Sequence, residues 1–471
     1  MRFRPLPYLL LFLAAVGCST RNEPLPPTPA EGYVALQDGR FVVDGEPWFP
    51  LMLNYKAFIV DGEVVPAPWY TGGGIRTHFD TMAAWGFNAV RVCLDVLPVD
   101  GDTAAMYLAT RRMVMQADSA GLRVMLLLKP PLDDRWTRYN AGLMRRLADL
   151  PALWAYDLMN EPLYFDPEPR RSKKDAVRTV ARWRQMVRQN APHQLFTVAT
   201  AEPIEVFEWD PALLPVDFVE MHTYHPLRVQ AEMWWYAHHC GKPWMVGETG
   251  LPADDDAVSY GAQADFLVET YRYALGCGAA GYGWWEFQDC PEGVNFEAQY
   301  TGLRNSSGLA KPAARRVAAL RMADTVPDAD VLSRPPANYF NMLAYQNVAA
   351  QGRIVDSRGL PVEGAVVRGW NDDWSVGVNT YSDSLGRFRL VSNDLCTHFE
   401  VSAAGYSRAK FDRRAALPAS LALPDRGREY QQIPLLGWGD PSHLLPTDSS
   451  RFAAPGAFAV EVGTVELKKL R

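Results

Sequence analysis

The stretch LWAYDLMN at residues 153–160 is a run of mostly apolar residues that ends in Asn160, and Glu161 and Pro162 follow it directly. A short apolar run of this kind is typical of a β-strand that is buried on both faces, as in a parallel sheet. The tripeptide Asn-Glu-Pro alone indicates little, because a given tripeptide occurs by chance in about one chain in twenty of this length. The rest of the chain has to decide whether Glu161 performs chemistry or only ends a strand.

Further apolar runs occur between residues 39 and 324, with helix-like segments such as 103–121 and 174–189 between them. The runs are PWFPLMLN (47–54), NAVRVCLD (88–95), RVMLLLK (123–129), LFTVAT (195–200), DFVEMHTY (217–224), PWMVGE (243–248) and GYGWWEF (281–287). Strands that alternate with helices predict parallel strands joined by right-handed crossovers. Together with 153–160 they predict an α/β fold, a (β/α)8 TIM barrel over residues 33–324 that closes with an amphipathic helix at 308–324.

The composition changes after the barrel. Residues 325–349 contain Arg334-Pro335-Pro336 and few periodic signals, which indicates a connector packed on the barrel. From 350 to 471 the chain has short alternating runs, many β-branched residues, and turn signals at Arg358-Gly359 and Leu385-Gly386. This pattern predicts a smaller all-β domain, an immunoglobulin-like or prealbumin-like sandwich.

The N-terminus, MRFRPLPYLLLFLAAVGCST, has the pattern of a secretory signal. Its apolar run from Tyr8 to Val16 is too short to span a bilayer. The small residues before Cys18 resemble the cleavage site of a bacterial lipoprotein, with residues 1–17 as the signal peptide. We therefore expect a lipid anchor on Cys18, a polar tether over 18–32, and a location in the bacterial cell envelope, with simple secretion as the alternative.

Charge and cysteine usage narrow the function further. Lys and Arg number 47 against 54 Asp and Glu, a net charge of -7, so no basic field attracts nucleic acid. The cysteines other than Cys18 have no zinc-site spacing, whereas Cys277 and Cys290 bracket one apolar segment and can pair in an oxidising compartment. The sequence thus predicts neither a metal site nor a nucleic-acid partner.

Polar residues at the strand ends carry the chemistry, because the active site of such a barrel lies at the C-terminal mouth. The positions concerned are Arg91, Asn160, Glu161, His222, Tyr224, Glu248 and Trp285. Cleavage of a glycosidic bond needs two carboxylates, one that protonates the leaving oxygen and one that attacks or activates water. Glu161 or Glu248 alone is commonly a solvated loop carboxylate, but the pair at one mouth favours catalysis.

Six motifs, in order, resemble a clan A glycoside hydrolase and within that clan most resemble glycoside hydrolase family 5, the cellulase- and mannanase-type barrel. They are GEPWFPLMLNY, GFNAVRV, NEP, HTYHP, GET and WWEFQD, from residue 39 to about 320, and GLAKPA resembles the closing segment of the clan. The resemblance implies that Glu161 is the general acid/base and Glu248 the nucleophile of a retaining double displacement. It also places Arg91 and Tyr224 beside the nucleophile.

The same resemblance implies substrate contacts. Asn160 would hold the sugar 2-hydroxyl, and Trp285 would stack on the sugar at the cleavage site. His222 would orient Tyr224 or touch the sugar. The alternatives are an Asx turn for Asn160 and a hydrogen-bonded barrel-wall residue for His222, and Trp284 faces the other way and is predicted to be core.

One departure from the family concerns specificity. Lys129 ends the third strand, where many family 5 cellulases have a histidine, and this departure argues against cellulose-type specificity.

The C-terminal domain shows a second resemblance. A carboxypeptidase regulatory-like domain is similar to it in the segments GRIVDSRGLPVEGAVV, TYSDSLGRFRL, VSAAGY and VEVGTVELKKL. This domain, over 350–471, shows no catalytic constellation and is interpreted as a spacer or interaction module.

The sequence as a whole predicts a retaining glycoside hydrolase that cleaves β-linked poly- or oligosaccharides in polysaccharide degradation, with β-mannan or β-glucan as the substrate class. It needs no cofactor, because the two carboxylates perform the chemistry. An exo-acting β-glycosidase of another clan A family, a barrel that binds glycan without cleaving it, and a scaffold for a surface complex stay open as alternatives. Two like charges held close together argue against a pure binder.

Overall fold

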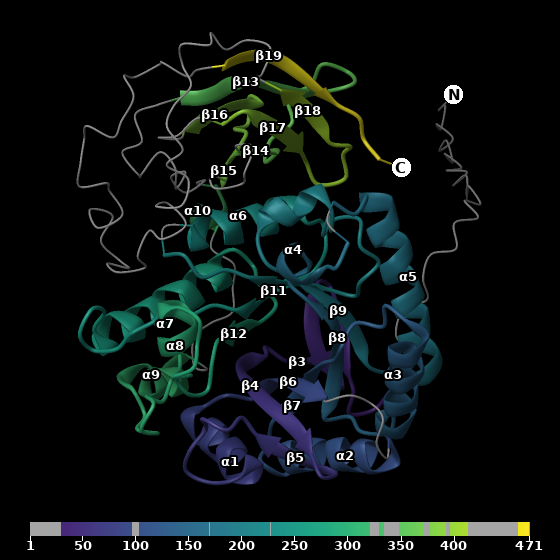
Figure 1. The fold of residues 1–471 in the computed structure, drawn as a ribbon, viewed down its shortest axis with the longest axis vertical. Coiled ribbons are helices and arrows are strands. Elements are labelled where there is room, and N and C mark those ends of the chain that lie inside the picture. The colour runs from purple at the N-terminus through teal and green to yellow at the C-terminus, as the bar shows by residue number, and fades with distance from the viewer. Residues whose placement is uncertain are drawn as a thin grey trace, which may run out of the picture.

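The computed structural model describes residues 30–96, 103–168, 170–226, 228–320, 329–333, 348–370, 377–391, 396–412 and 460–470. Cys18, the signal peptide, most of the tether and Arg334-Pro335-Pro336 lie outside these ranges. The described chain forms a barrel with helices around it and a smaller β domain packed against it (Figure 1). No helix within these ranges is both long and apolar enough to cross a membrane.

Eight parallel strands close into the barrel. They are β4 (Leu51–Val60), β6 (Ala89–Val96), β7 (Arg123–Leu127), β8 (Leu153–Asn160), β9 (Leu195–Thr200), β10 (Val219–His222), β11 (Trp244–Glu248) and β12 (Tyr282–Trp284). Each strand pairs with the next in chain order, and β12 pairs back with β4 through Tyr282 and Leu51. The predicted (β/α)8 barrel is therefore confirmed, and every apolar run contributes a strand.

The first barrel strand begins later than the sequence indicates. β4 starts at Leu51 instead of residue 47 and ends in a hairpin with β5 (Glu63–Pro66). Pro47 lies in β3 (Glu46–Pro47) of a small antiparallel sheet with β1 (Val34–Gln37) and β2 (Arg40–Val43). Proline has no amide hydrogen to donate to a barrel ladder. In this small sheet Phe41 packs edge-on against Trp154 and Phe218, which covers the N-terminal end of the barrel.

Helices surround the barrel (Figure 1). The longer ones are α1 (Ile75–Trp85), α2 (Thr103–Ser119), α3 (Asp134–Leu147), α5 (Lys173–Asn190), α6 (Val229–His239), α7 (Tyr260–Gly276) and α9 (Pro312–Leu320). Short α4 (Pro162–Phe165), η1 (Pro203–Phe207) and α8 (Phe296–Tyr300) follow strands β8, β9 and β12. Asp133, Ser172 and Ser259 cap α3, α5 and α7 by accepting hydrogen bonds from amides in the first turn.

The C-terminal part forms two facing sheets, as predicted. Their strands are β13 (Val348–Asp356), β14 (Val366–Trp370), β15 (Gly377–Tyr381), β16 (Arg387–Val391), β17 (His398–Ser402), β18 (Ala409–Asp412) and β19 (Val460–Leu467). The sheet orders are β16-β13-β19 and β15-β14-β17-β18, and residues such as Ile354, Phe388 and Phe399 form the core between them. Gly359 and Gly386 have φ of 78° and 74°, which suits glycine at the two predicted turns.

Buried polar contacts fix the sandwich on the barrel. Lys173 Nζ donates to Asp210 Oδ2 at 2.8 Å and to two sandwich carbonyls, Ala403 O at 2.9 Å and Tyr406 O at 2.7 Å. Helix α10 (Ala329–Ser333) of the predicted connector contacts α6 and α7. Cys277 and Cys290, which the sequence allowed to pair, are both free thiols.

Candidate active site

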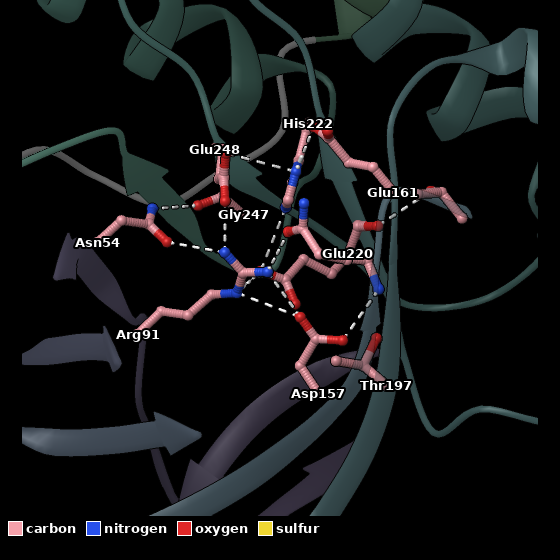
Figure 2. Close-up of polar contacts among 12 residues, drawn as sticks. Asn54, Arg91, Asp157, Glu161, Thr197, Glu220, His222, Gly247 and Glu248 are labelled. Carbon is pink, nitrogen blue, oxygen red and sulfur yellow. Dashed lines mark hydrogen bonds and ion pairs between the residues drawn. The ribbon is translucent and has the colours of Figure 1, made fainter. Parts of the chain in front are cut away.

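A cavity of about 770 Å³ opens at the carboxyl ends of the barrel strands. Six of the residues predicted from the sequence line it: Asn160, Glu161, His222, Tyr224, Glu248 and Trp285. The seventh, Arg91, is fully buried and contacts the cavity residues from within the barrel (Figure 2). The barrel thus gathers residues from five strands at one mouth.

Glu161 enters the cavity because the chain turns sharply at the end of β8. Its backbone has φ 39° and ψ 72°, in the left-handed region that residues other than glycine seldom adopt. The amide of Glu161 still donates to Ala199 O at 2.9 Å, and Pro162 then begins α4. This turn leaves the Glu161 side chain 16% exposed, compared with 6% for the Glu248 side chain.

Two donors hold Glu248. Arg91 Nη1 donates to Glu248 Oε1, and the Tyr224 hydroxyl donates to Oε2. A positive charge and a hydrogen bond both stabilise the ionised form of a carboxylate. Burial and the charge of Glu248 raise the pKa of Tyr224 well above its ordinary value, so the hydroxyl keeps the proton that it donates.

Arg91 is in turn fixed by polar residues inside the barrel (Figure 2). Its Nη2 donates to Asp157 Oδ2 and to Asn160 Oδ1, each at 2.7 Å, and its Nη1 donates to Asn54 Oδ1 at 3.0 Å. Its Nε lies 3.2 Å from Glu220 Oε1. A planar guanidinium with this many partners has one orientation, and it therefore orients Glu248 and Asn160 together.

His222 lies between the two glutamates and contacts Glu161. Its Nδ1 is 2.8 Å from Glu161 Oε1 and 3.5 Å from Glu248 Oε2, and its Nε2 is 3.7 Å from Glu220 Oε1. Burial disfavours the charged ring, but the charge of Glu248 and the hydrogen bond with Glu161 outweigh it and raise the pKa of His222 to about 10. His222 is therefore an imidazolium at neutral pH. Its contact with Glu161 orients that side chain, and its predicted contacts with Tyr224 or a sugar stay predictions.

Within the described ranges, Glu161, His222 and Glu248 form the one group of three side chains whose ligand atoms lie close enough, within 4.8 Å of one another, to hold a metal ion. Two neighbours act against metal binding here. A metal ion needs the neutral ring of His222, whereas Glu161 and Glu248 raise the pKa of the ring and so favour its protonated form. The Arg91 guanidinium on Glu248 also repels a second cation.

Trp284 and Trp285 point to opposite sides, as neighbouring residues of a strand do. Trp284 is fully buried and its Nε1 donates to Thr301 O at 3.0 Å, so it belongs to the core. Trp285 lines the cavity. The peptide bond between Trp285 and Glu286 is cis.

Several polar residues of the site were not found from the sequence. Inside the barrel they are Asn54, Asp157 and Glu220, and on the cavity wall they include Lys56, Glu202, Arg228 and Glu297. The signal for some of them was available, because side chains two apart on a strand share a face. In the register of β4 and β6, Asn54 pairs with Arg91 and Lys56 pairs with Cys93, which places Lys56 one step nearer the mouth.

No family model matches the chain, and no curated protein is similar to it in sequence. Among solved structures, it is similar to a variant of GH5_18 from Streptomyces cattleya in complex with Manb1-4GlcNAc, with 20% identity, a TM-score of 0.46, and coverage of 60% of this chain and 79% of that one. It is similar to the exo-beta-1,4-mannosidase Op5Man5 from Opitutaceae bacterium strain TAV5, with 21% identity, a TM-score of 0.49 and coverage of 63% of each chain. It is also similar to the beta-glucuronidase of Faecalibacterium prausnitzii, with 15% identity, a TM-score of 0.45, and coverage of 62% of this chain and 52% of that one.

The closed ring of eight parallel strands establishes the fold by itself. The chain is a (β/α)8 barrel with a β-sandwich packed on it, and its cavity holds two glutamates at the carboxyl ends of β8 and β11.

Proposed function

We propose that the protein is a retaining glycoside hydrolase of clan A, most like family 5, that cleaves β-linked glycans. The observation that carries the proposal is the spacing of the two carboxylates, since an oxygen of Glu161 and one of Glu248 lie within 4.8 Å of each other. Retaining enzymes hold their carboxyl groups about 5 to 5.5 Å apart, whereas inverting enzymes need about 6.5 to 9.5 Å to admit a water. The order of motifs along the chain supports the same family.

In the first step Glu248 attacks the anomeric carbon while Glu161 donates its proton to the leaving oxygen, so the glycosidic bond breaks and a glycosyl ester forms. In the second step Glu161 takes a proton from water, the water oxygen bonds to the anomeric carbon, and Glu248 leaves as a carboxylate. Arg91 and Tyr224 each donate a hydrogen bond to Glu248 and so orient its carboxyl group for the attack.

His222 positions Glu161 for both steps, because its Nδ1 lies 2.8 Å from Glu161 Oε1. Glu248 loses its negative charge when it becomes an ester, so the surroundings of Glu161 differ between the step in which it gives a proton and the step in which it takes one.

The substrate class that the motifs support is β-mannan or β-glucan, in polysaccharide degradation. An exo-acting β-glycosidase of another clan A family is the alternative, because WWEFQD at the eighth strand suits such enzymes as well. Contacts of Asn160 with the sugar 2-hydroxyl and of Trp285 with the sugar face are part of the proposal, and both residues line the cavity.

The test is a panel of β-mannan, β-glucan, xylan and aryl β-glycosides. Glu161→Gln and Glu248→Gln should each lower kcat by about 10²-fold or more on the substrate that the wild type cleaves best. Glu292→Gln, at an exposed position, serves as the matched control and should keep full activity. With Glu161→Ala and an activated aryl glycoside, the glycosyl-enzyme should accumulate and azide should restore turnover. Full activity in both glutamine variants, or no cleavage of any substrate, would refute the proposal.

We also propose that a lipid on Cys18 anchors the protein in the bacterial cell envelope. The signal-like N-terminus supports this proposal. Wild-type protein expressed in bacteria should incorporate labelled palmitate and fractionate with membranes, whereas Cys18→Ala should do neither. Cys240→Ala, which removes a buried thiol of the barrel, is the control and should still be labelled. Label retained in Cys18→Ala would place the lipid elsewhere.

We propose that the C-terminal sandwich acts as a spacer or interaction module.

A further inference from the structure

Lys56 is a cavity residue that the proposed mechanism does not use. It lies on β4 two residues after Asn54, so its side chain is on the face of the strand that looks into the barrel mouth. Its Nζ lies 4.9 Å from the ring centroid of Trp285 and 5.4 Å from that of Trp69. Among the described residues, no carboxylate comes within ion-pair distance of this ammonium group. Its described contacts are therefore two indole rings and the cavity.

Charge is distributed unevenly around the cavity. Glu161 and Glu202 follow β8 and β9, Glu248 ends β11, and Glu297 lies in α8. Lys56 of β4 and Lys129, which follows β7, line the cavity as well. Arg228 is paired with Glu202 at 2.9 Å. Lys56 thus presents positive charge to a ligand that stacks on Trp285.

Glu286 is a buried carboxyl that interacts with the charge of Lys56. It is buried, and its Oε2 accepts a hydrogen bond from Tyr70 at 2.5 Å. Burial raises the pKa of Glu286 to about 7 against the opposing charge of Lys56. The hydrogen bond of this carboxyl is with Tyr70, and among the described residues Glu286 forms no ion pair with Lys56.

We propose that Lys56 binds an anionic substituent on the sugar that stacks on Trp285, so that the substrate is a β-linked glycan bearing carboxylate or sulfate groups. This inference rests on the proposed function, because it needs a sugar on Trp285. A pyranose that stacks its face on an indole carries the substituent at C5 at its edge. A carboxylate or a 6-sulfate there lies beside the Lys56 ammonium, which is already partly stripped of water by the two rings.

The competing explanation is that Lys56 only balances the charge of the catalytic glutamates. In that case its removal would affect neutral and anionic substrates alike. A substrate-binding role instead predicts a change in the ratio between the two. A charge-assisted hydrogen bond of this kind corresponds to about 10- to 100-fold in kcat/KM.

The experiment compares three aryl β-glycosides that differ only at C6, in the sugar configuration that the panel above identifies: the neutral sugar, its uronic acid and its 6-sulfate. The wild type should prefer an anionic member. Lys56→Gln should lower kcat/KM for that member by about 10- to 100-fold and for the neutral sugar by less than about 3-fold. Lys129→Gln, at an exposed lysine that also lines the cavity, should change the ratio less. The carboxylate and sulfate members distinguish the two sources of charge.

Two results would overturn the inference. One is a wild type that cleaves the neutral sugar at least as well as both anionic ones, which leaves the hydrolase proposal intact. The other is an equal loss on all three substrates in Lys56→Gln. If no glycoside is cleaved, the proposed function fails. Calorimetric binding of a glucuronate-containing β-oligosaccharide and of its neutral counterpart then tests the role of Lys56. The inference then requires tighter binding of the acidic ligand by wild type than by Lys56→Gln, and equal binding of both ligands overturns it.

Discussion

At the scale of single residues, His222 links the charge states of the two glutamates. It is buried, 2.8 Å from one glutamate and 3.5 Å from the other, and it carries a proton at neutral pH. An unpaired buried charge is costly, so the three groups depend on one another. The arrangement therefore makes the stability of the barrel sensitive to pH through this one ring.

The pKa of His222 predicts the direction of that sensitivity. Its folded value of about 10 is above the ordinary value of 6.5, so the stabilisation is fully present below pH 6.5 and is lost as pH rises to about 10. Urea unfolding at pH 6, 8 and 10 measures this effect. The free energy of unfolding of the wild type should exceed that of His222→Gln by an amount that becomes smaller as pH rises. For His238→Gln, at an exposed position of α6, the difference should stay constant. A constant difference for His222→Gln as well would contradict the assignment.

At the scale of elements, the barrel strands could be predicted because buried parallel strands are continuous apolar runs. The strand ends then indicated Glu161 and Glu248. The sequence predicted the start of β4 at residue 47 instead of Leu51. Pro47 and Pro50 lie in a run that stays apolar, so hydrophobicity alone does not show where the strand begins. Residues in the middle of a strand, such as Asp157, become part of the site only through the register of the closed barrel, which one sequence does not specify.

Loop elements were beyond prediction for a different reason. Glu205 of η1 is buried, and its Oε1 accepts hydrogen bonds from the amides of Ala201 at 2.9 Å and Leu163 at 3.2 Å. Burial raises the pKa of this carboxyl to about 8. These contacts tie the loop after β9 to α4, the element that follows Glu161. They depend on the conformations of two loops at once, for which apolar periodicity carries no signal.

At the scale of the whole molecule, the barrel and the sandwich share buried polar groups. Arg368 of β14 pairs with Glu208 at 3.0 Å, and Trp235 Nε1 of α6 donates to Gly364 O at 2.7 Å. Lys173 joins a barrel carboxylate to two sandwich carbonyls. Contacts of this kind favour unfolding of both domains in one transition.

Removal of Lys173 should therefore weaken the whole chain. Lys173→Met leaves Asp210 buried without its cation, so we expect a loss of about 3 to 5 kcal/mol in the free energy of unfolding. Lys174→Met, at the exposed neighbouring position, should change it by less than about 0.5 kcal/mol. Denaturant unfolding followed by tryptophan fluorescence measures both. A loss in Lys173→Met no larger than in the control would mean that the interface contributes little.

The small sheet β1–β3 has a consequence for orientation. It covers the end of the barrel opposite to the cavity, and the described chain begins there, where Gly32 O accepts from Arg123 Nη1 at 3.0 Å. If Cys18 carries a lipid, the attachment reaches the barrel at this closed pole. The cavity then opens at the pole opposite to the attachment, so the anchor would not stand between the mouth and an arriving polymer.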